Sequence, residues 1–182
     1  MKLSLLCALF LLLFQGCSVK VGNINTESAK QIELASDIMA LGSRIDKKEA
    51  YSIAKEALSH PKVLAKQYNL VTPASYHNML IHLGYRSRGL CSHWSEDMMA
   101  HLKKQKYKTI DLRWGVANKG GEEEHNSVVV VPKGGTFESG IILDPWRNSG
   151  DLYWTRIGAD EKFQWIEDKK RTTVLGTVKV IK

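Results

Sequence analysis

The fold of this chain is decided by the stretch His125-Asn126-Ser127-Val128-Val129-Val130-Val131. Its continuous β-branched run, Ser127–Val131, is typical of a central strand in a sheet. Upstream, Ile110–Val116 alternates apolar with polar residues, which predicts a half-buried strand. Three further strands are expected, separated by glycine-containing turns, at Phe137–Asp144, Leu152–Ile157 and Val174–Ile181.

The first half of the chain repeats its apolar residues at helical spacing instead. We expect a first helix over Glu27–Gly42 and a second from Asp46, where Glu49 completes an acidic variant of a capping box. Pro61 is expected to interrupt or end the second helix. Two more helices are predicted, over Thr72–Leu83 and Cys91–Gln105. Helices followed by strands predict one α+β domain, with the helices packed on a mainly antiparallel sheet.

The N-terminus has the pattern of an export signal. Lys2 precedes an apolar run from Leu3 to Phe14, which is too short to span a bilayer and fits the apolar region of a signal peptide. The run leads into Phe14-Gln15-Gly16-Cys17, which resembles the lipobox of bacterial lipoproteins. The alternative is an ordinary secretory signal with a cysteine near its cleavage site.

The lipobox resemblance implies a division of the chain. Residues 1–16 form a signal peptide, Cys17 becomes the lipidated N-terminus, residues 17–26 are a tether and residues 27–182 are a single domain. Lipidated Cys17 then attaches the protein to a membrane of the bacterial cell envelope. Ser18 stands where an aspartate would resemble an inner-membrane retention signal, so the resemblance favours the periplasmic face of the outer membrane.

The composition bounds the possible partners. The chain has 182 residues and a formal net charge of +7. A modestly basic surface favours anionic lipid headgroups or acidic cell-wall material, and it is equally an ordinary protein surface. The sequence contains no nucleic-acid-binding motif, and export argues against a nucleic-acid partner. The sequence does not determine the oligomeric state.

The cysteines single out one thiol. Cys7 leaves with the signal peptide and Cys17 carries lipid, so Cys91 remains unpaired in an oxidising compartment. Such a cysteine is either buried and inert or reactive for a purpose. Cys91 opens a predicted helix, whose N–H groups and dipole favour the thiolate, and Gly89 allows a tight turn before it. The backbone N–H of Cys91 is a natural donor to an oxyanion.

Two residues downstream supply the groups that a cysteine nucleophile needs. His125 begins one predicted strand and Asp144 ends another, so adjacent strands bring the two side chains together. The imidazole accepts the proton of the Cys91 thiol, and the carboxylate orients the imidazole and stabilises its cation. Each residue also has a simpler role: Cys91 as a small buried hydrophobe, His125 as a strand-end residue and Asp144 as a turn former.

These residues stand in motifs that resemble a known superfamily. Gly89-Leu90-Cys91, His125-Asn126-Ser127-Val128 and Leu143-Asp144-Pro145-Trp146 occur in the order of the transglutaminase-like branch of the papain-like cysteine hydrolases. The resemblance covers Thr72–Trp154 and implies a Cys91-His125-Asp144 triad on an α+β core. It leaves the N-terminal helices unexplained. The short interval from Cys91 to His125 excludes papain itself, whose histidine follows by more than about a hundred residues.

Further candidates lie near these motifs. His93 is not required by the superfamily, and it competes as the base, binds substrate or points to solvent. Trp94 and Trp146 are candidates for substrate binding, or else they are walls of the core or of a pocket. Polar residues upstream of Cys91, one of which could donate to an oxyanion, are His77, Asn78 and His82.

Metal binding is disfavoured as an alternative for Cys91, His93 and His125. A histidine two residues after a cysteine does not match common zinc spacing, and neither Cys-x-x-Cys nor His-Glu-x-x-His occurs in the sequence. We therefore predict neither a metal nor a cofactor.

Two functional hypotheses follow from these observations. The first is a lipid-anchored cell-envelope cysteine enzyme that cleaves or transfers an amide acyl group of a peptide or protein, with hydrolysis preferred because water is always available. The second is a non-catalytic lipoprotein that uses the same fold as a binding or assembly module. In that case the three side chains do not converge, or Cys91 is unreactive.

Overall fold

The computed structural model describes residues 26–174. The predicted signal peptide, the predicted lipidation site Cys17 and the predicted tether, apart from Thr26, lie outside the described residues. The strand predicted at Val174–Ile181 also lies outside them, except for Val174, which is the last residue of a helix.

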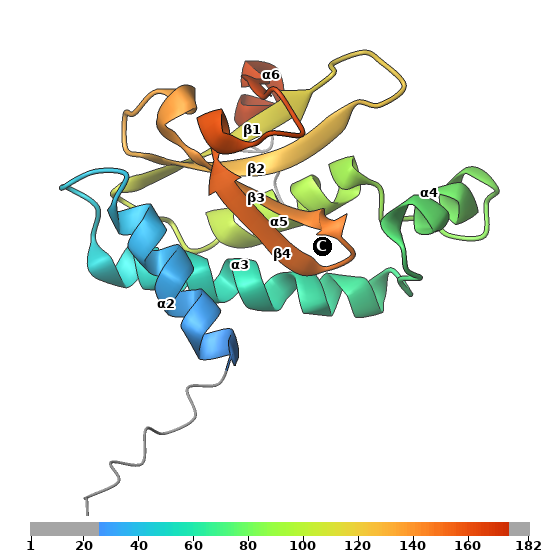
Figure 1. The fold of residues 1–182 in the computed structure, drawn as a ribbon, viewed down its shortest axis with the longest axis horizontal. Helices are drawn as coiled ribbons and strands as arrows, with labels where there is room; N and C mark the ends of the chain where they lie inside the picture. Colours follow the sequence, from blue (N-terminus) through green and yellow to red (C-terminus); the bar gives the residue numbers. More distant parts are fainter. Residues whose placement is uncertain (1–25, 175–182) are drawn as a thin grey trace, which may run out of the picture.

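Helices come first along the described chain, and a five-stranded sheet follows (Figure 1). The helices are α2 Thr26–Met39, α3 Lys47–Gln67, α4 Ala74–His82, α5 Cys91–Lys103 and α6 Lys169–Val174. The strands are β1 Ile110–Ala117, β2 His125–Pro132, β3 Ile141–Asn148, β4 Asp151–Arg156 and β5 Ile166–Glu167. Short 3-10 turns occur at η1 Phe137–Ser139 and η2 Ile157–Ala159. The strand order is β4-β3-β2-β1-β5 and every pairing is antiparallel, which confirms the predicted α+β class.

Strand β2 is central, as its valine run predicts, and both of its faces are buried. Val128 and Val130 pack against the helices, whereas Val129 and Val131 belong to a second apolar cluster on the opposite face. Successive side chains of a strand point to opposite faces, so a strand covered on both sides needs apolar residues at every position. This double burial explains the unbroken valines.

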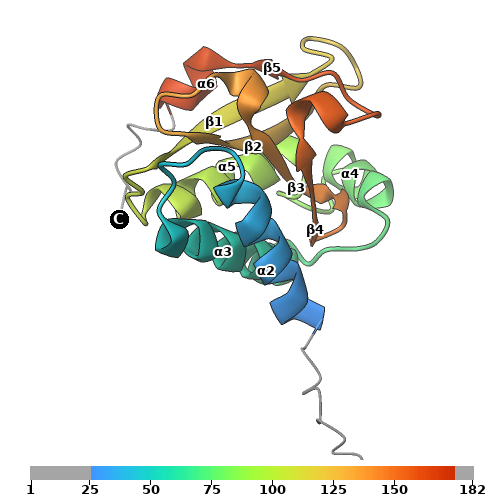
Figure 2. The same cartoon turned by 60° about the vertical axis from the view of Figure 1, so that its left-hand side comes forward.

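Each face of the sheet has its own cover. Helices α3 and α5 pack on one face and α2 packs across α3, while η1, η2 and the segment leading into β5 cover the other face (Figure 2). Helix α4 lies to the side of this helical layer, and the loop after it leads directly into α5 (Figure 1). No helix within residues 26–174 combines the length and the apolar character needed to cross a membrane.

Helix α3 begins as predicted but does not end as predicted. Asp46 is its N-cap, and the Asp46 Oδ1 accepts from the Glu49 backbone N–H at 3.1 Å. The Glu49 carboxylate turns away from the cap and accepts instead from the backbone N–H groups of Lys108 and Thr109. The prediction that Pro61 interrupts or ends the helix is wrong, because α3 continues to Gln67. Buried residues on both sides of Pro61 hold that turn against the core.

Candidate active site

Cys91 is the first residue of α5, at the predicted helix start. The residue before the helix, Leu90, is its N-cap, and Gly89 has a φ of +128° that residues with a side chain rarely adopt. A Cβ at Gly89 would lie 2.3 Å from the Nε2 of His77, so only glycine fits there. This close approach lets the chain turn sharply into α5 and presents the Cys91 sulfur at the helix N-terminus.

Three side chains fix the turn that carries Cys91. The fully buried His77 accepts from the Val71 N–H at Nδ1, so its Nε2 carries the proton and donates to the Arg88 carbonyl at 2.9 Å. The Nδ1 of His93 accepts from the N–H groups of Gly89 and Leu90 at 3.1 and 3.3 Å. The Trp94 indole N–H donates to the Gly89 carbonyl at 2.9 Å.

These contacts give His93 and Trp94, both predicted as candidates for substrate binding, a structural role instead. His93 caps α5 through its Nδ1, and burial, followed by the nearby Arg88 cation, lowers the pKa of His93. Trp94 is only 1% exposed and belongs to the core. Neither residue lines the pocket beside Cys91, so the structure offers no substrate contact for them there.

His125 and Asp144 form the buried pair that the sequence predicts. They are 3% and 0% exposed, and the His125 Nε2 donates to the Asp144 Oδ2 at 2.6 Å. Strands β2 and β3 carry them as antiparallel neighbours. Because Nε2 is engaged by the carboxylate, Nδ1 is the nitrogen left to face the Cys91 thiol.

Asp144 is itself held from behind by Arg147. The Arg147 backbone N–H and Nε donate to the two carboxylate oxygens of Asp144 at 3.1 Å each. The other end of the same guanidinium makes a bidentate pair with the buried Asp160 at 3.1 and 2.7 Å. Burial raises the pKa of Asp160, but the hydrogen bonds from Arg147 and Trp165 outweigh it and bring the pKa to about 2. The Asp144 carboxylate is therefore fixed before any substrate arrives.

Aromatic rings enclose the His125 imidazole. The ring of Phe163 is 4.5 Å from it between centroids, that of Trp146 is 4.9 Å away and that of Trp165 is 5.4 Å away. Phe163 and Trp165 lie in the segment between η2 and β5, far along the sequence from His125. These rings exclude water from the imidazole and restrict its rotation.

The electrostatics of the site favour a thiolate–imidazolium pair. Burial raises the pKa of the Cys91 thiol. The hydrogen bond and positive charge of His125, together with hydrogen bonds from Asn126, outweigh burial and bring the pKa below its ordinary value. Burial lowers the pKa of His125, but Asp144 and then Cys91 raise it to about 9. The lowered pKa of the thiol and the raised pKa of the imidazole both favour transfer of the proton from Cys91 to His125.

A cavity of about 250 Å³ opens beside the Cys91 sulfur. Of the three predicted catalytic residues, Cys91 and His125 line it; the other lining residues are Asn78, Glu122, Glu123, Glu124, Trp146, Lys162 and Phe163. The Trp146 indole N–H donates to the Asn78 Oδ1 at 3.2 Å, which links α4 to β3 across this wall. Trp146 therefore forms part of the wall of this cavity, unlike His93 and Trp94.

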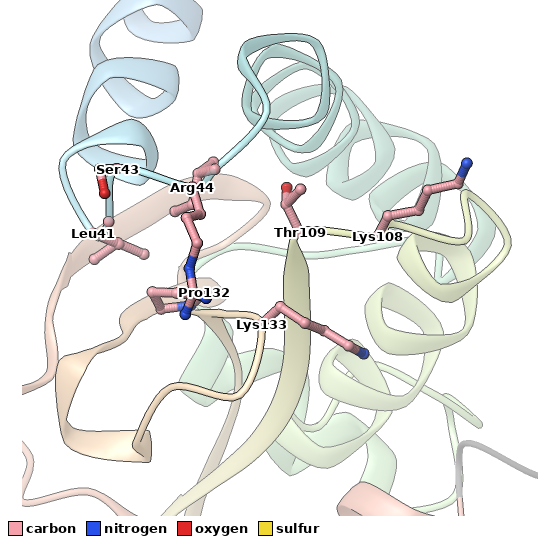
Figure 3. Close-up of a pocket in the computed structure, with 9 residues that line it drawn as sticks. Leu41, Ser43, Arg44, Lys108, Thr109, Pro132 and Lys133 are labelled. Atoms are coloured by element: carbon pink, nitrogen blue, oxygen red, sulfur yellow. The ribbon is translucent and has the colours of Figure 1, made fainter.

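A larger cavity, of about 590 Å³, lies elsewhere, between the α2–α3 turn and the ends of β1 and β2 (Figure 3). Its basic residues are Arg44, Lys108 and Lys133, and in the close-up the two lysine side chains point away from Arg44. The Lys133 Nζ is already paired with Asp111 at 2.6 Å. Because its charges diverge and its lining includes no histidine or carboxylate that could activate a hydroxyl, this cavity is a weaker candidate than the pocket at Cys91.

Sequence reasoning missed several residues of the site. Asn126 lies inside the His125 motif and Arg147 follows Trp146 directly, so the position of each next to a motif residue is a signal that could have identified it. Asp160 and Phe163 come from a loop without any pattern that marks them. Within residues 26–174, no group of three or more histidine, cysteine or acidic side chains could hold a metal ion.

Comparison with known proteins identifies no relative of this chain. No protein-family model matches the chain, and no significant match is found to a curated protein or to a solved structure. The site must therefore be interpreted from its own residues.

Proposed function

We propose that this chain is a cysteine acyl-transfer enzyme that cleaves or transfers the acyl group of a peptide or protein amide. The observation that carries the proposal is the buried 2.6 Å contact between His125 and Asp144 at a pocket whose wall also holds Cys91. A thiol at a helix N-terminus, a base and a group that orients the base are the components of an activated nucleophile. The arrangement resembles that of the transglutaminase-like cysteine enzymes.

The chemistry proceeds through a thioester on Cys91. The sulfur attacks the amide carbonyl carbon and a C–S bond forms; the C–N bond then breaks while the His125 proton passes to the departing nitrogen. Water or an amine next attacks the thioester and gives its proton to His125. The C–S bond breaks, and Cys91 returns as the thiolate. Hydrolysis is the preferred outcome, since water is always present.

The proposed setting is the bacterial cell envelope. The lipobox-like sequence at Cys17 supports attachment of the chain to a membrane by lipid, on the periplasmic face of the outer membrane. Metabolic labelling with palmitate tests this part: the wild-type protein should carry the label and Cys17→Ala should not. A wild-type protein without the label would contradict lipid anchoring.

The convergence of the three side chains supports an enzyme over a binding module. A module has no need of a carboxylate that is 0% exposed and held on both oxygens behind a histidine. Burying such a charge is costly unless its partners repay the cost, so the arrangement is more readily explained by a reaction that uses the histidine.

An activated acyl donor tests the proposal without knowledge of the natural substrate. With p-nitrophenyl acetate we expect a burst of nitrophenolate and an acetyl group on Cys91 that mass spectrometry detects. The burst should disappear in Cys91→Ala and weaken strongly in His125→Ala. Faster turnover on adding a primary amine would favour transfer over hydrolysis. A wild-type protein without a burst would contradict the proposal.

A further inference from the structure

Asn126 is a buried polar residue beside Cys91 that the chemistry above does not use. It is 3% exposed and follows His125 directly on β2. Because neighbouring side chains of a strand point to opposite faces, Asn126 lies on the helix-covered face of Val128, while His125 lies on the other. Cys91 sits at the end of the strand, where side chains from both faces reach it.

The orientation of the Asn126 carboxamide is determined by its partners. Its Oδ1 accepts from the Trp114 indole N–H at 2.8 Å and from the Arg171 guanidinium. Both partners can only donate, so the oxygen must face them and the NH₂ group must face the opposite way. That NH₂ group lies 3.8 Å from the Cys91 Sγ and 3.2 Å from the Glu124 Oε1.

Arg171 ties this amide to helix α6. The same guanidinium nitrogen that contacts Asn126 also contacts the Glu124 Oε1 at 3.2 Å. The guanidinium lies over the Trp114 ring at 5.4 Å from its centroid, and the Arg171 backbone N–H donates to the Asp168 Oδ1 at 3.0 Å. The carboxamide oxygen thus accepts from two donors and its NH₂ group donates to a carboxylate, so the carboxamide is held in one orientation.

We propose that the Asn126 carboxamide is a hydrogen-bond donor to the Cys91 thiolate, held toward the sulfur by Trp114 and Arg171. This assignment rests on the proposed acyl-transfer function, because it concerns the ionised form of the nucleophile. Asn126 is then a catalytic residue in the strict sense, since it contacts the reacting sulfur atom.

The donor would act in both halves of the reaction. In the resting enzyme it stabilises the thiolate and fixes the direction of the sulfur lone pairs toward the cavity. When the thioester forms, the sulfur loses its charge and the hydrogen bond weakens. When the C–S bond breaks, charge returns to the sulfur and the same NH₂ group stabilises the leaving thiolate.

The pKa of Cys91 agrees with this geometry. Burial raises it and His125 lowers it most strongly, and the backbone N–H and the side chain of Asn126 lower it further. The backbone N–H and the carboxamide both belong to Asn126, so a substitution of its side chain removes the carboxamide donor and keeps the backbone donor.

The test is the pH dependence of Cys91 alkylation by iodoacetamide in Asn126→Asp. The carboxylate keeps acceptors for Trp114 and Arg171 but presents an oxygen to the sulfur in place of the NH₂ group. We expect the midpoint of alkylation to rise by about one pH unit or more, and the rate below the midpoint to fall about tenfold.

A second variant and a control keep the test decisive if Asn126→Asp folds poorly. Arg171→Gln, at a side chain that is 40% exposed, loosens the carboxamide and should raise the midpoint by a smaller amount. Arg156→Gln is the matched control, because the Arg156 guanidinium donates to the Ala40 carbonyl and not to Asn126, and it should leave the midpoint unchanged. Circular dichroism confirms that each variant is folded.

The outcomes separate this inference from the function on which it rests. A low wild-type midpoint that rises in His125→Ala but stays fixed in folded Asn126→Asp would overturn the role of Asn126 and leave the proposed function standing. If Asn126→Asp does not fold, a fixed midpoint in Arg171→Gln decides in the same way. A wild-type midpoint at the ordinary thiol value, unmoved in His125→Ala, would remove the proposed function itself.

Discussion

Two histidines of this molecule contact a carboxylate at nearly the same distance, and they differ in everything else. His125 meets Asp144 at 2.6 Å with side chains 3% and 0% exposed, whereas His101 meets Glu56 at 2.7 Å with both side chains 23% exposed. His125 has a thiol as its third partner. His101 instead stacks on His60, with the ring centroids 3.7 Å apart. A carboxylate contact alone therefore does not identify a catalytic histidine.

The surroundings of the two carboxylates explain the difference. Asp144 is fixed on both oxygens by Arg147, which is itself fixed by Asp160, so the charge beside His125 cannot move away. Glu56 on α3 is 23% exposed, so water partly screens its charge. We conclude that rigid support of the carboxylate, together with a nucleophile on the far side of the ring, distinguishes the proposed active site.

The largest effect should come from neutralising Asp144, the buried one of the two carboxylates. Asp144→Asn keeps the shape of the side chain but removes the charge that holds the proton on His125. We expect acylation of Cys91 by an activated ester to slow by on the order of 10²–10⁴-fold. Stopped-flow measurement of the nitrophenolate burst gives the rate.

Glu56→Gln is the matched control on the partly exposed pair of Glu56 and His101, and it should leave that rate unchanged. An equal loss of rate in both variants would remove the distinction between the two histidines. An unimpaired Asp144→Asn protein would show that the buried pair has no part in the chemistry.

A smaller effect, on stability, should follow from removing the support of Asp144. Arg147→Ala leaves the buried Asp144 and Asp160 without their common cation. Breaking a buried ion pair on one side costs about 3–5 kcal/mol, so we expect the free energy of unfolding in urea to fall by roughly that amount. Lys133→Ala breaks an exposed pair with Asp111 and should cost less than about 1 kcal/mol. Equal losses in the two variants would contradict the proposed burial of the Arg147 network.

The smallest expected effect is the pH dependence of the stacked pair. Burial, and then the charge of His101, lower the pKa of His60 from its ordinary 6.5 to about 4. The folded state therefore prefers neutral His60, and this contribution is present above about pH 6.5 and is lost as the pH falls toward 4. His60→Gln should reduce the acid sensitivity of the melting temperature in that range. A His60→Gln protein with unchanged acid sensitivity would argue against a lowered His60 pKa.

Much of the fold could be read from local patterns. The valine run predicts the central strand β2, and the alternation of Ile110–Val116 predicts β1, because burial on two faces or on one leaves a direct trace in the sequence. Asp46 marks the start of α3 through the capping of the Glu49 N–H. The helix start at Cys91 and the strand start at His125 follow from the same kind of pattern. The prediction that Asp144 ends a strand over Phe137–Asp144 is wrong, because Phe137–Ser139 forms a 3-10 turn and β3 continues past Asp144 to Asn148.

What local patterns could not give is the partner of each polar side chain. Pro61 lacks an N–H, yet packing on both sides of it keeps α3 continuous, a tertiary effect that outweighs local preference. Arg147 and Asp160 pair across the end of the sheet, and Asn126 meets Arg171 from a helix formed much later in the chain. Such pairs depend on how distant elements pack, and no periodicity of the sequence encodes them.

The most direct measurement of the central claim is the rate of Cys91 alkylation by iodoacetamide across pH, in the wild type and in His125→Ala. We predict a wild-type midpoint clearly below the ordinary thiol value of about 8.5, and a rise toward that value in His125→Ala, because the imidazolium no longer stabilises the thiolate. A midpoint near about 8.5 in both proteins would contradict the thiolate–imidazolium pair and, with it, the proposed enzyme.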